Sequence, residues 1–265
     1  MNDPDLKLLI GLVLVIVLGG AAWYYWDEIF PPPEPEPAVA APAPVEPQAD
    51  GSPRYPMPEA PGDATSSELV ELPALDDSDS YFLLEIGATF GPAIEALLLR
   101  EGVIDRLVAT VDNLPRGQLP EQIRPVGQLQ EPFRPDAGEA DTLILSYSSY
   151  TRYEALVAQI YYADIDAVYD TYQRYYPLFQ KAYERLGYPN AYFNDRLIEV
   201  IDHLVATPMP EGPVVLTRPK VLYEFADPDL EALSSGQKLM LRMGPDNAAT
   251  IKRLLQKFRE RLVQS

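Results

Sequence analysis

The feature that most constrains this chain is an uninterrupted apolar segment near its N-terminus. Residues 8–26 read LLIGLVLVIVLGGAAWYYW, nineteen residues without a charge. At about 1.5 Å of rise per residue, a helix of this length covers about 28 Å, close to the thickness of a bilayer core. The aromatic cluster at residues 23–26 is typical of a membrane–water interface. The sequence therefore predicts a single transmembrane helix over residues 8–26, with residues 1–7 as a short tail.

The basic residues around this segment indicate which way it crosses the membrane. Lys7 precedes the run, and the next Lys or Arg in the chain is Arg54. Because basic residues next to a span tend to stay in the cytoplasm, we expect a cytoplasmic N-terminus and an exported C-terminal domain. A cleaved signal peptide is the alternative, since Gly20 and Ala22 provide small residues for a cleavage site. The aromatic cluster favours a retained anchor.

Residues 27–74 are acidic and rich in proline, which predicts a disordered, extended stalk. Between residues 27 and 79 the chain has thirteen of its 28 prolines, thirteen acidic residues and one basic residue. Proline fixes φ and has no N–H, so the segment favours polyproline II at about 3.1 Å per residue, or about 130 Å from Pro31 to Pro73. The negative charge disfavours direct binding to nucleic acid or to anionic lipid.

Residues 75–265 are enough for one globular domain with a substantial core. Apolar residues recur at intervals of three and four, which predicts a mainly α-helical fold. The expected helices cover residues 80–112 (with breaks near 91 and 102), 151–162, 164–186, 191–206, 234–244 and 245–263. The proline-rich stretch 114–149 predicts an irregular loop. The β-rich stretch 214–225, interrupted by Pro219, predicts at most a short hairpin or an extended arm.

Local signals indicate where these helices begin, bend and end. Pro177 lies inside the longest expected helix and predicts a kink or a break there. Gly187 is expected to end the same helix. Asp227, which precedes a proline, predicts the cap of a short helical turn. Ser234 and Gln237 have the spacing of a capping box.

Most of the tyrosines gather in the middle of the domain, twelve of the seventeen between residues 147 and 192. Three of them repeat every seven residues beside the apolar stripe of the longest expected helix. Core packing is one interpretation, and an exposed aromatic platform for a sugar, a peptide or a proline-rich segment is the other. One form of the second interpretation is that the chain's own stalk docks there. The candidate partner-binding tyrosines are Tyr169, Tyr176, Tyr183, Tyr188 and Tyr192.

Arg116 is a further candidate for contact with a partner. It lies in the motif NLPRG, residues 113–117, beside a Pro–Gly turn at an expected helix end. A guanidinium in this position is suited to hold an anion or a carboxylate of another protein. A surface arginine in an ordinary turn is the simpler interpretation.

One cluster of titratable residues is a candidate for chemistry. Glu199, Asp202 and His203 share one side of an expected helix, and their side chains are of the types that bind divalent metals or transfer protons. His203 is the only histidine, so no second one completes a familiar zinc set, and a Glu–His pair at this spacing is also an ordinary helix-surface contact. We therefore expect no metal and no cofactor.

Familiar catalytic signatures are absent from the sequence. There is no cysteine, which excludes disulfides and thiol catalysis. There is also no P-loop, no dinucleotide-binding fingerprint, no G-x-S-x-G and no H-E-x-x-H. The absence of these motifs favours a protein that is not an enzyme.

Three long motifs resemble a family of bacterial domains of unknown function. They are ATVDNLPRG (109–117), YPLFQKAYERLGYPNAYFNDRLIEVIDHL (176–204) and RPKVLYEFADPDLEALSSGQKLMLRMGP (218–245). The resemblance implies a protein of Gram-negative bacteria with an N-terminal span, a proline-rich spacer and a helical distal domain. It implies no activity, substrate or catalytic residue.

Together these features predict a single-pass inner-membrane protein whose N-terminus is cytoplasmic and whose domain is periplasmic. We expect a non-enzymatic interaction or scaffold module that binds a protein partner in the cell envelope and does not bind nucleic acid. Two alternatives stay open. One is a module that binds an envelope polymer, such as peptidoglycan or a polysaccharide, through exposed tyrosines. The other is a metal- or carboxylate-dependent enzyme that uses Glu199, Asp202 and His203.

Overall fold

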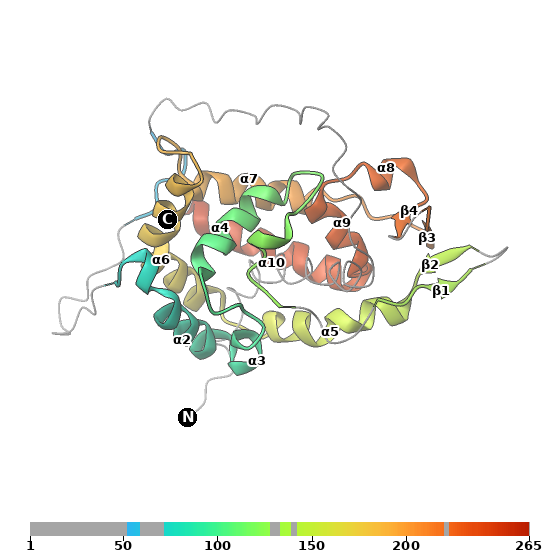
Figure 1. The fold of residues 1–265 in the computed structure, drawn as a ribbon, viewed down its shortest axis with the longest axis horizontal. Helices are drawn as coiled ribbons and strands as arrows, with labels where there is room; N and C mark the ends of the chain where they lie inside the picture. Colours follow the sequence, from blue (N-terminus) through green and yellow to red (C-terminus); the bar gives the residue numbers. More distant parts are fainter. Residues whose placement is uncertain (1–51, 59–71, 128–132, 139–141, 220–222, 265) are drawn as a thin grey trace.

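The computed structural model describes residues 52–58, 72–127, 133–138, 142–219 and 223–264. The predicted transmembrane helix and most of the predicted stalk lie outside these residues. Within them, no helix combines the length and the apolar character that a membrane span needs. The described part of the chain is mainly helical and has a small sheet at one end (Figure 1).

Most elements in the described part of the chain are helices, and the strands are short. The helices are α2 (Asp79–Phe90), α3 (Pro92–Glu95), α4 (Val103–Asn113), α5 (Tyr147–Tyr161), α6 (Ile165–Arg185), α7 (Phe193–Val205), α8 (Pro228–Glu231), α9 (Ser235–Arg242) and α10 (Pro245–Val263). The 3-10 turns are η2 (Leu75–Asp77) and η3 (Glu121–Ile123). The strands are β1 (Asp136–Ala137), β2 (Leu143–Leu145), β3 (Val214–Thr217) and β4 (Glu224–Phe225).

The core forms where α6 packs against α2, α4, α7 and α10. Phe82 of α2 is fully buried and meets the rings of Tyr175 and Phe179 edge-on, with centroids 5.0 and 5.7 Å apart. Tyr172, also on α6, reaches the ring of Phe258 on α10 at 5.8 Å. Edge-to-face ring pairs add to the free energy gained by burial. The apolar stripe that predicted the longest helix is thus its buried face.

Several helix ends have the predicted caps. In the capping box at α9, the Ser234 hydroxyl accepts from the Gln237 N–H at 3.2 Å, and the Gln237 side chain accepts from the Ser234 N–H at 3.4 Å. At α8 the Asp227 carboxylate accepts from the Asp229 N–H at 2.9 Å. Gly187 follows the end of α6 with a φ of 106°, a conformation that glycine adopts without steric cost.

The longest helix continues through Pro177, where the sequence predicted either a kink or a break. α6 extends from Ile165 to Arg185 with Pro177 inside it, so the break does not occur. A proline in a helix interior removes one hydrogen bond and costs about 3 kcal/mol. The residues on both sides of it, among them Tyr175, Leu178 and Phe179, are buried in the core. Their burial stabilises the helix enough to offset the defect.

The sheet is larger than the predicted hairpin. β3 and β4 form that hairpin, but β2 pairs with β3, with Ile144 opposite Val215, and β1 pairs with β2, all antiparallel. β1 and β2 lie in the stretch that was predicted to be an irregular loop, and α5 begins at Tyr147 rather than at residue 151. Three residues are too few for a visible alternating pattern, and strand propensity depends on the partner strand, which is distant in sequence.

Candidate functional site

Residues 52–58, part of the predicted stalk, lie against the helical domain. We call this segment, SPRYPMP, the strap; it is blue in Figure 1. Pro53, Tyr55 and Met57 are half-buried, whereas the residues between them are exposed. This alternation is typical of an extended chain with one side on a surface. The side chains of Tyr55 and Met57 pack against the domain core.

The start of α7 binds the main chain of the strap. The Asp195 carboxylate accepts from the backbone N–H groups of Arg54 and Tyr55, at 2.9 Å each. The Asn194 side-chain amide donates to the Tyr55 carbonyl, also at 2.9 Å. Asn194 is fully buried, and its own oxygen accepts from the Tyr172 hydroxyl at 3.2 Å. Its orientation is therefore fixed by the core as well as by the strap.

α6 holds the C-terminal end of the strap. The Gln173 side-chain amide donates to the carbonyl oxygen of Pro58 at 3.0 Å. The Tyr169 hydroxyl lies 3.7 Å from the sulfur of Met57. We call a set of five domain residues whose side-chain polar atoms contact the strap the strap-binding surface. They are Tyr169, Gln173, Asn194, Asp195 and Glu199.

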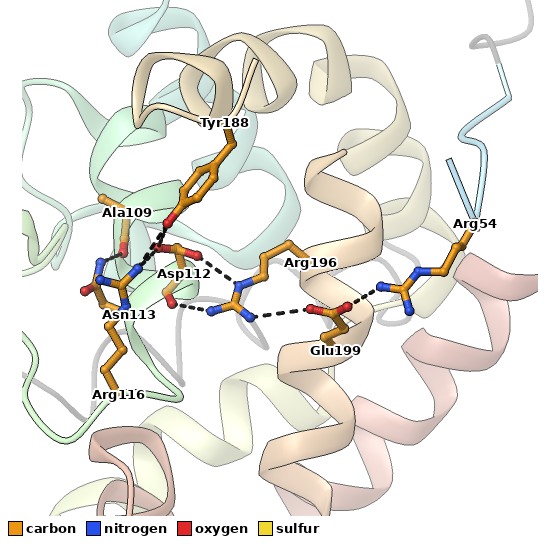
Figure 2. Close-up of polar contacts among 8 residues, drawn as sticks. All are labelled: Arg54, Ala109, Asp112, Asn113, Arg116, Tyr188, Arg196 and Glu199. Carbon is orange, nitrogen blue, oxygen red and sulfur yellow. Dashed lines mark hydrogen bonds and ion pairs between the residues drawn. The ribbon is translucent and has the colours of Figure 1, made fainter. Parts of the chain in front are cut away.

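A chain of charged side chains connects the strap to the end of α4 (Figure 2). Arg54 of the strap pairs with Glu199 of α7, and this hydrogen bond raises the pKa of Arg54. Glu199 also pairs with Arg196 at 3.4 Å. Arg196 donates from Nε to the Asp112 carboxylate at 2.9 Å and from a terminal nitrogen to the Asp112 carbonyl at 2.8 Å.

Asp112 is the buried centre of this network. Its residue exposure is 3%, and Arg116, one turn later, donates to its carboxylate at 2.6 Å. The Tyr188 hydroxyl lies 3.4 Å from the same carboxylate oxygen and 3.2 Å from the Arg116 guanidinium. A buried carboxylate is costly unless it is paired and hydrogen-bonded. Two guanidinium groups supply that pairing here, which ties α4, α7 and the segment after α6 together.

The candidate tyrosines lie in different environments. Tyr169 and Tyr183 are 3% and 2% exposed, so neither presents a ring to solvent. Tyr183 stacks on Tyr188 with centroids 4.7 Å apart, and burial raises its pKa. Tyr176 is half-buried, and burial raises its pKa to about 12. Tyr192 is half-buried at the start of α7.

Three of the predicted contact residues thus lie at two different parts of the domain. Arg116 and Tyr188 meet at Asp112, whereas Tyr169 contacts the strap. Residues 52–58 of the predicted stalk lie against the domain, and of the candidate tyrosines Tyr169 has a side-chain contact with them. The contact uses amide, carboxylate and hydroxyl groups rather than a row of exposed rings.

The three candidates for metal or acid–base chemistry have three different partners. Glu199 binds the strap, Asp202 accepts from Arg259 at 2.5 and 3.0 Å, and Nε2 of His203 lies 2.7 Å from the Ser234 hydroxyl. Among the residues that the structure describes, no group of three or more His, Cys, Asp or Glu side chains is placed to hold a metal ion.

Sequence reasoning did not identify Asp112, Asn194 or Gln173 as contact residues. One signal in the sequence does point to the strap. Arg54 is the only basic residue between residues 27 and 74, which are otherwise acidic and rich in proline, and Asp195 and Glu199 are one turn apart on the helix that binds it. Opposite charges on a stalk and on a helix favour their association.

Comparison with known families shows which part of the chain belongs to a described family. A profile for a family described as protein of unknown function (DUF3014) matches residues 103–259, from the start of α4 nearly to the end of α10. The chain belongs to this family. The match includes the whole strap-binding surface and the Asp112 network up to α7, whereas the strap precedes it. Comparisons with curated proteins and with solved structures gave no match.

Replacing Asp112 tests its role at the centre of the network. Asp112→Asn removes the buried charge that pairs with Arg196 and leaves Arg196 only its 3.4 Å contact with Glu199, so we expect a loss of about 3 kcal/mol in the free energy of unfolding. Arg116→Gln is the matched control, because its side chain is 46% exposed and we expect a loss below about 1 kcal/mol. Urea unfolding followed by circular dichroism measures both. Equal losses in the two variants would contradict this role for Asp112.

His203 gives the domain a predictable pH dependence. Burial, and to a lesser extent the charge of Arg196, lowers the pKa of His203. The unfolded chain therefore takes up this proton first as the pH falls through about 6.5, and the folded state loses stability. Between about pH 7.5 and 5.5 we expect the melting temperature of the wild-type protein to fall further than that of His203→Gln. An equal fall in melting temperature for the two proteins over this pH range would show that His203 does not contribute to the pH dependence.

Proposed function

We propose that this chain is a non-enzymatic interaction module of the bacterial cell envelope. Residues 8–26 anchor it in the inner membrane, residues 1–7 stay in the cytoplasm, and the helical domain stands in the periplasm, where it binds a protein partner. The support for the anchor is the length of the apolar run, its aromatic border and the position of Lys7.

The contact between strap and domain carries this proposal. Asp195 and Asn194 hydrogen-bond the main chain of an extended segment, and Gln173 does so further along it. Every second side chain of this segment, at positions 53, 55 and 57, is half-buried. Domains that recognise peptides combine main-chain hydrogen bonds with contacts to alternate side chains in this way. A domain with such a surface is suited to hold a segment of a protein.

The two alternative functions have less support. Binding of an envelope polymer through tyrosine rings needs exposed rings, and those of Tyr169 and Tyr183 are buried. Chemistry at Glu199, Asp202 and His203 needs these side chains to converge, and each is bonded to a different element. Interaction with a protein requires neither condition.

Topology is the first test of this proposal. Alkaline phosphatase fused after Ser265 is expected to be active in cells, because this enzyme folds only outside the cytoplasm. A green fluorescent protein fused at the same position is expected to stay dark after export through the general secretory pathway. A fluorescent fusion together with an inactive phosphatase fusion would place the domain in the cytoplasm and overturn the envelope assignment.

In-cell cross-linking tests the binding of a partner. A photoreactive phenylalanine at Tyr192, the residue before the helix that holds the strap, is expected to give a cross-linked product with another protein. The matched control is the same substitution at Tyr147, which is 70% exposed at the start of α5. Immunoblots and mass spectrometry identify the products. The absence of a product at position 192, or the same products at both positions, would contradict this binding face.

A further inference from the structure

We infer that the strap-binding surface is a site for an extended segment of a partner protein, and that the strap is an internal ligand which this segment replaces. The inference rests on the proposed function and specifies which residue types the bound segment has. The segment has a basic residue, then an aromatic residue, then a proline, as in Arg54, Tyr55 and Pro56.

The backbone contacts determine where prolines are allowed. Asp195 accepts from the N–H groups of two consecutive residues, Arg54 and Tyr55. Proline has no N–H, so neither of these two positions can be proline. The prolines of the strap lie at positions 53, 56 and 58, outside this pair. A ligand for this surface therefore has two non-proline residues flanked by prolines that keep it extended.

The side-chain contacts determine which residues fill that pair. Glu199 pairs with the first side chain, and the neighbouring Asp195 carboxylate adds negative charge, so a basic residue is favoured over an acidic one there. The second side chain, Tyr55, packs against the core, which selects an aromatic ring. Two positions later Met57 packs against the same core. The preferred ligand is thus proline–basic–aromatic–proline–apolar.

The surface is organised by contacts that do not involve the strap. Tyr172 holds Asn194 from within the core, and Arg196 holds Glu199 through its second carboxylate oxygen. A site whose groups are already oriented loses little entropy when a ligand binds. The same surface is therefore ready to receive another segment once the strap leaves.

The strap itself is a weak ligand. Its Arg54 side chain is 62% exposed and the Glu199 side chain 47% exposed, and ion pairs this exposed contribute little. The side chains that face the domain are only half-buried. Covalent attachment raises the local concentration of the strap, which compensates for weak contacts. A partner segment with better side-chain contacts is able to displace it.

Peptide binding to the full-length protein in detergent tests this inference. The probe is a fluorescent peptide with the sequence SPRYPMP, and the readout is fluorescence anisotropy. The proteins are the wild type and a strap variant with Arg54→Ala, Tyr55→Ala and Met57→Ala. The strap of this variant keeps its backbone groups but has lost the side chains that contact the domain. It therefore competes less well with the probe, and we expect the variant to bind the probe about tenfold more tightly than the wild type.

Two controls assign the binding to the contacts described. Adding Asp195→Ala to the strap variant is expected to weaken probe binding about tenfold, with circular dichroism to check the fold. A probe N-methylated at its Arg and Tyr has no N–H for Asp195, and is expected to bind the strap variant at least about tenfold more weakly than the plain probe. This second control needs no change in the protein.

Three results would overturn the inference. They are no probe binding to the strap variant, equal binding to variant and wild type, and undiminished binding of the N-methylated probe. Light scattering adds a fourth, since a wild-type dimer that the strap substitutions dissociate would assign the surface to a second copy of the chain. If the reporter fusions after Ser265 place the domain in the cytoplasm, the envelope location is overturned but peptide binding is not. Failure of the proposed location and failure of this inference are therefore distinguishable.

Discussion

The buried carboxylate of Asp112 is the constraint on which the charged side of this domain depends. A carboxylate with so little exposure must be compensated, and Arg116 and Arg196 compensate it. Arg196 is thereby fixed with its guanidinium between Asp112 and Glu199 (Figure 2). Glu199 then has one oxygen directed to Arg196 and one to the strap. A requirement of the core thus sets the charge that the surface presents.

Helix α6 also contributes both to the core and to the strap-binding surface. Its inner face packs rings such as Tyr172 and Phe179 against α2, α7 and α10. Its rim supplies Gln173 and the Tyr169 hydroxyl to the strap. Because the strap-binding residues are on packed helices rather than on loops, their positions relative to one another are fixed by core packing. Binding an extended segment therefore requires little rearrangement of the domain.

Sequence patterns predicted the parts of this structure that depend on local signals. Helix spacing, the cap at Asp227 and the capping box at Ser234 act within a few residues, and all are present. β2 depends on a partner strand far along the chain, and three residues carry no period that reveals it. The burial of Tyr169 and Tyr183 depends on which neighbouring elements cover that flank of α6. A seven-residue repeat places side chains on one flank but does not indicate whether that flank is covered.

The composition of the predicted stalk is compatible with the proposed role of residues 52–58 as a ligand. A polyproline-type chain forms no hydrogen bonds within itself, so its remaining N–H and C=O groups are available to another surface. Proline also reduces the conformational entropy that is lost when such a chain is held in one geometry. What distinguishes residues 52–58 is a basic and an aromatic residue, both with N–H groups, between two prolines. The carboxylates and the amide of α7 bind the two N–H groups, the guanidinium and the Tyr55 carbonyl of that combination.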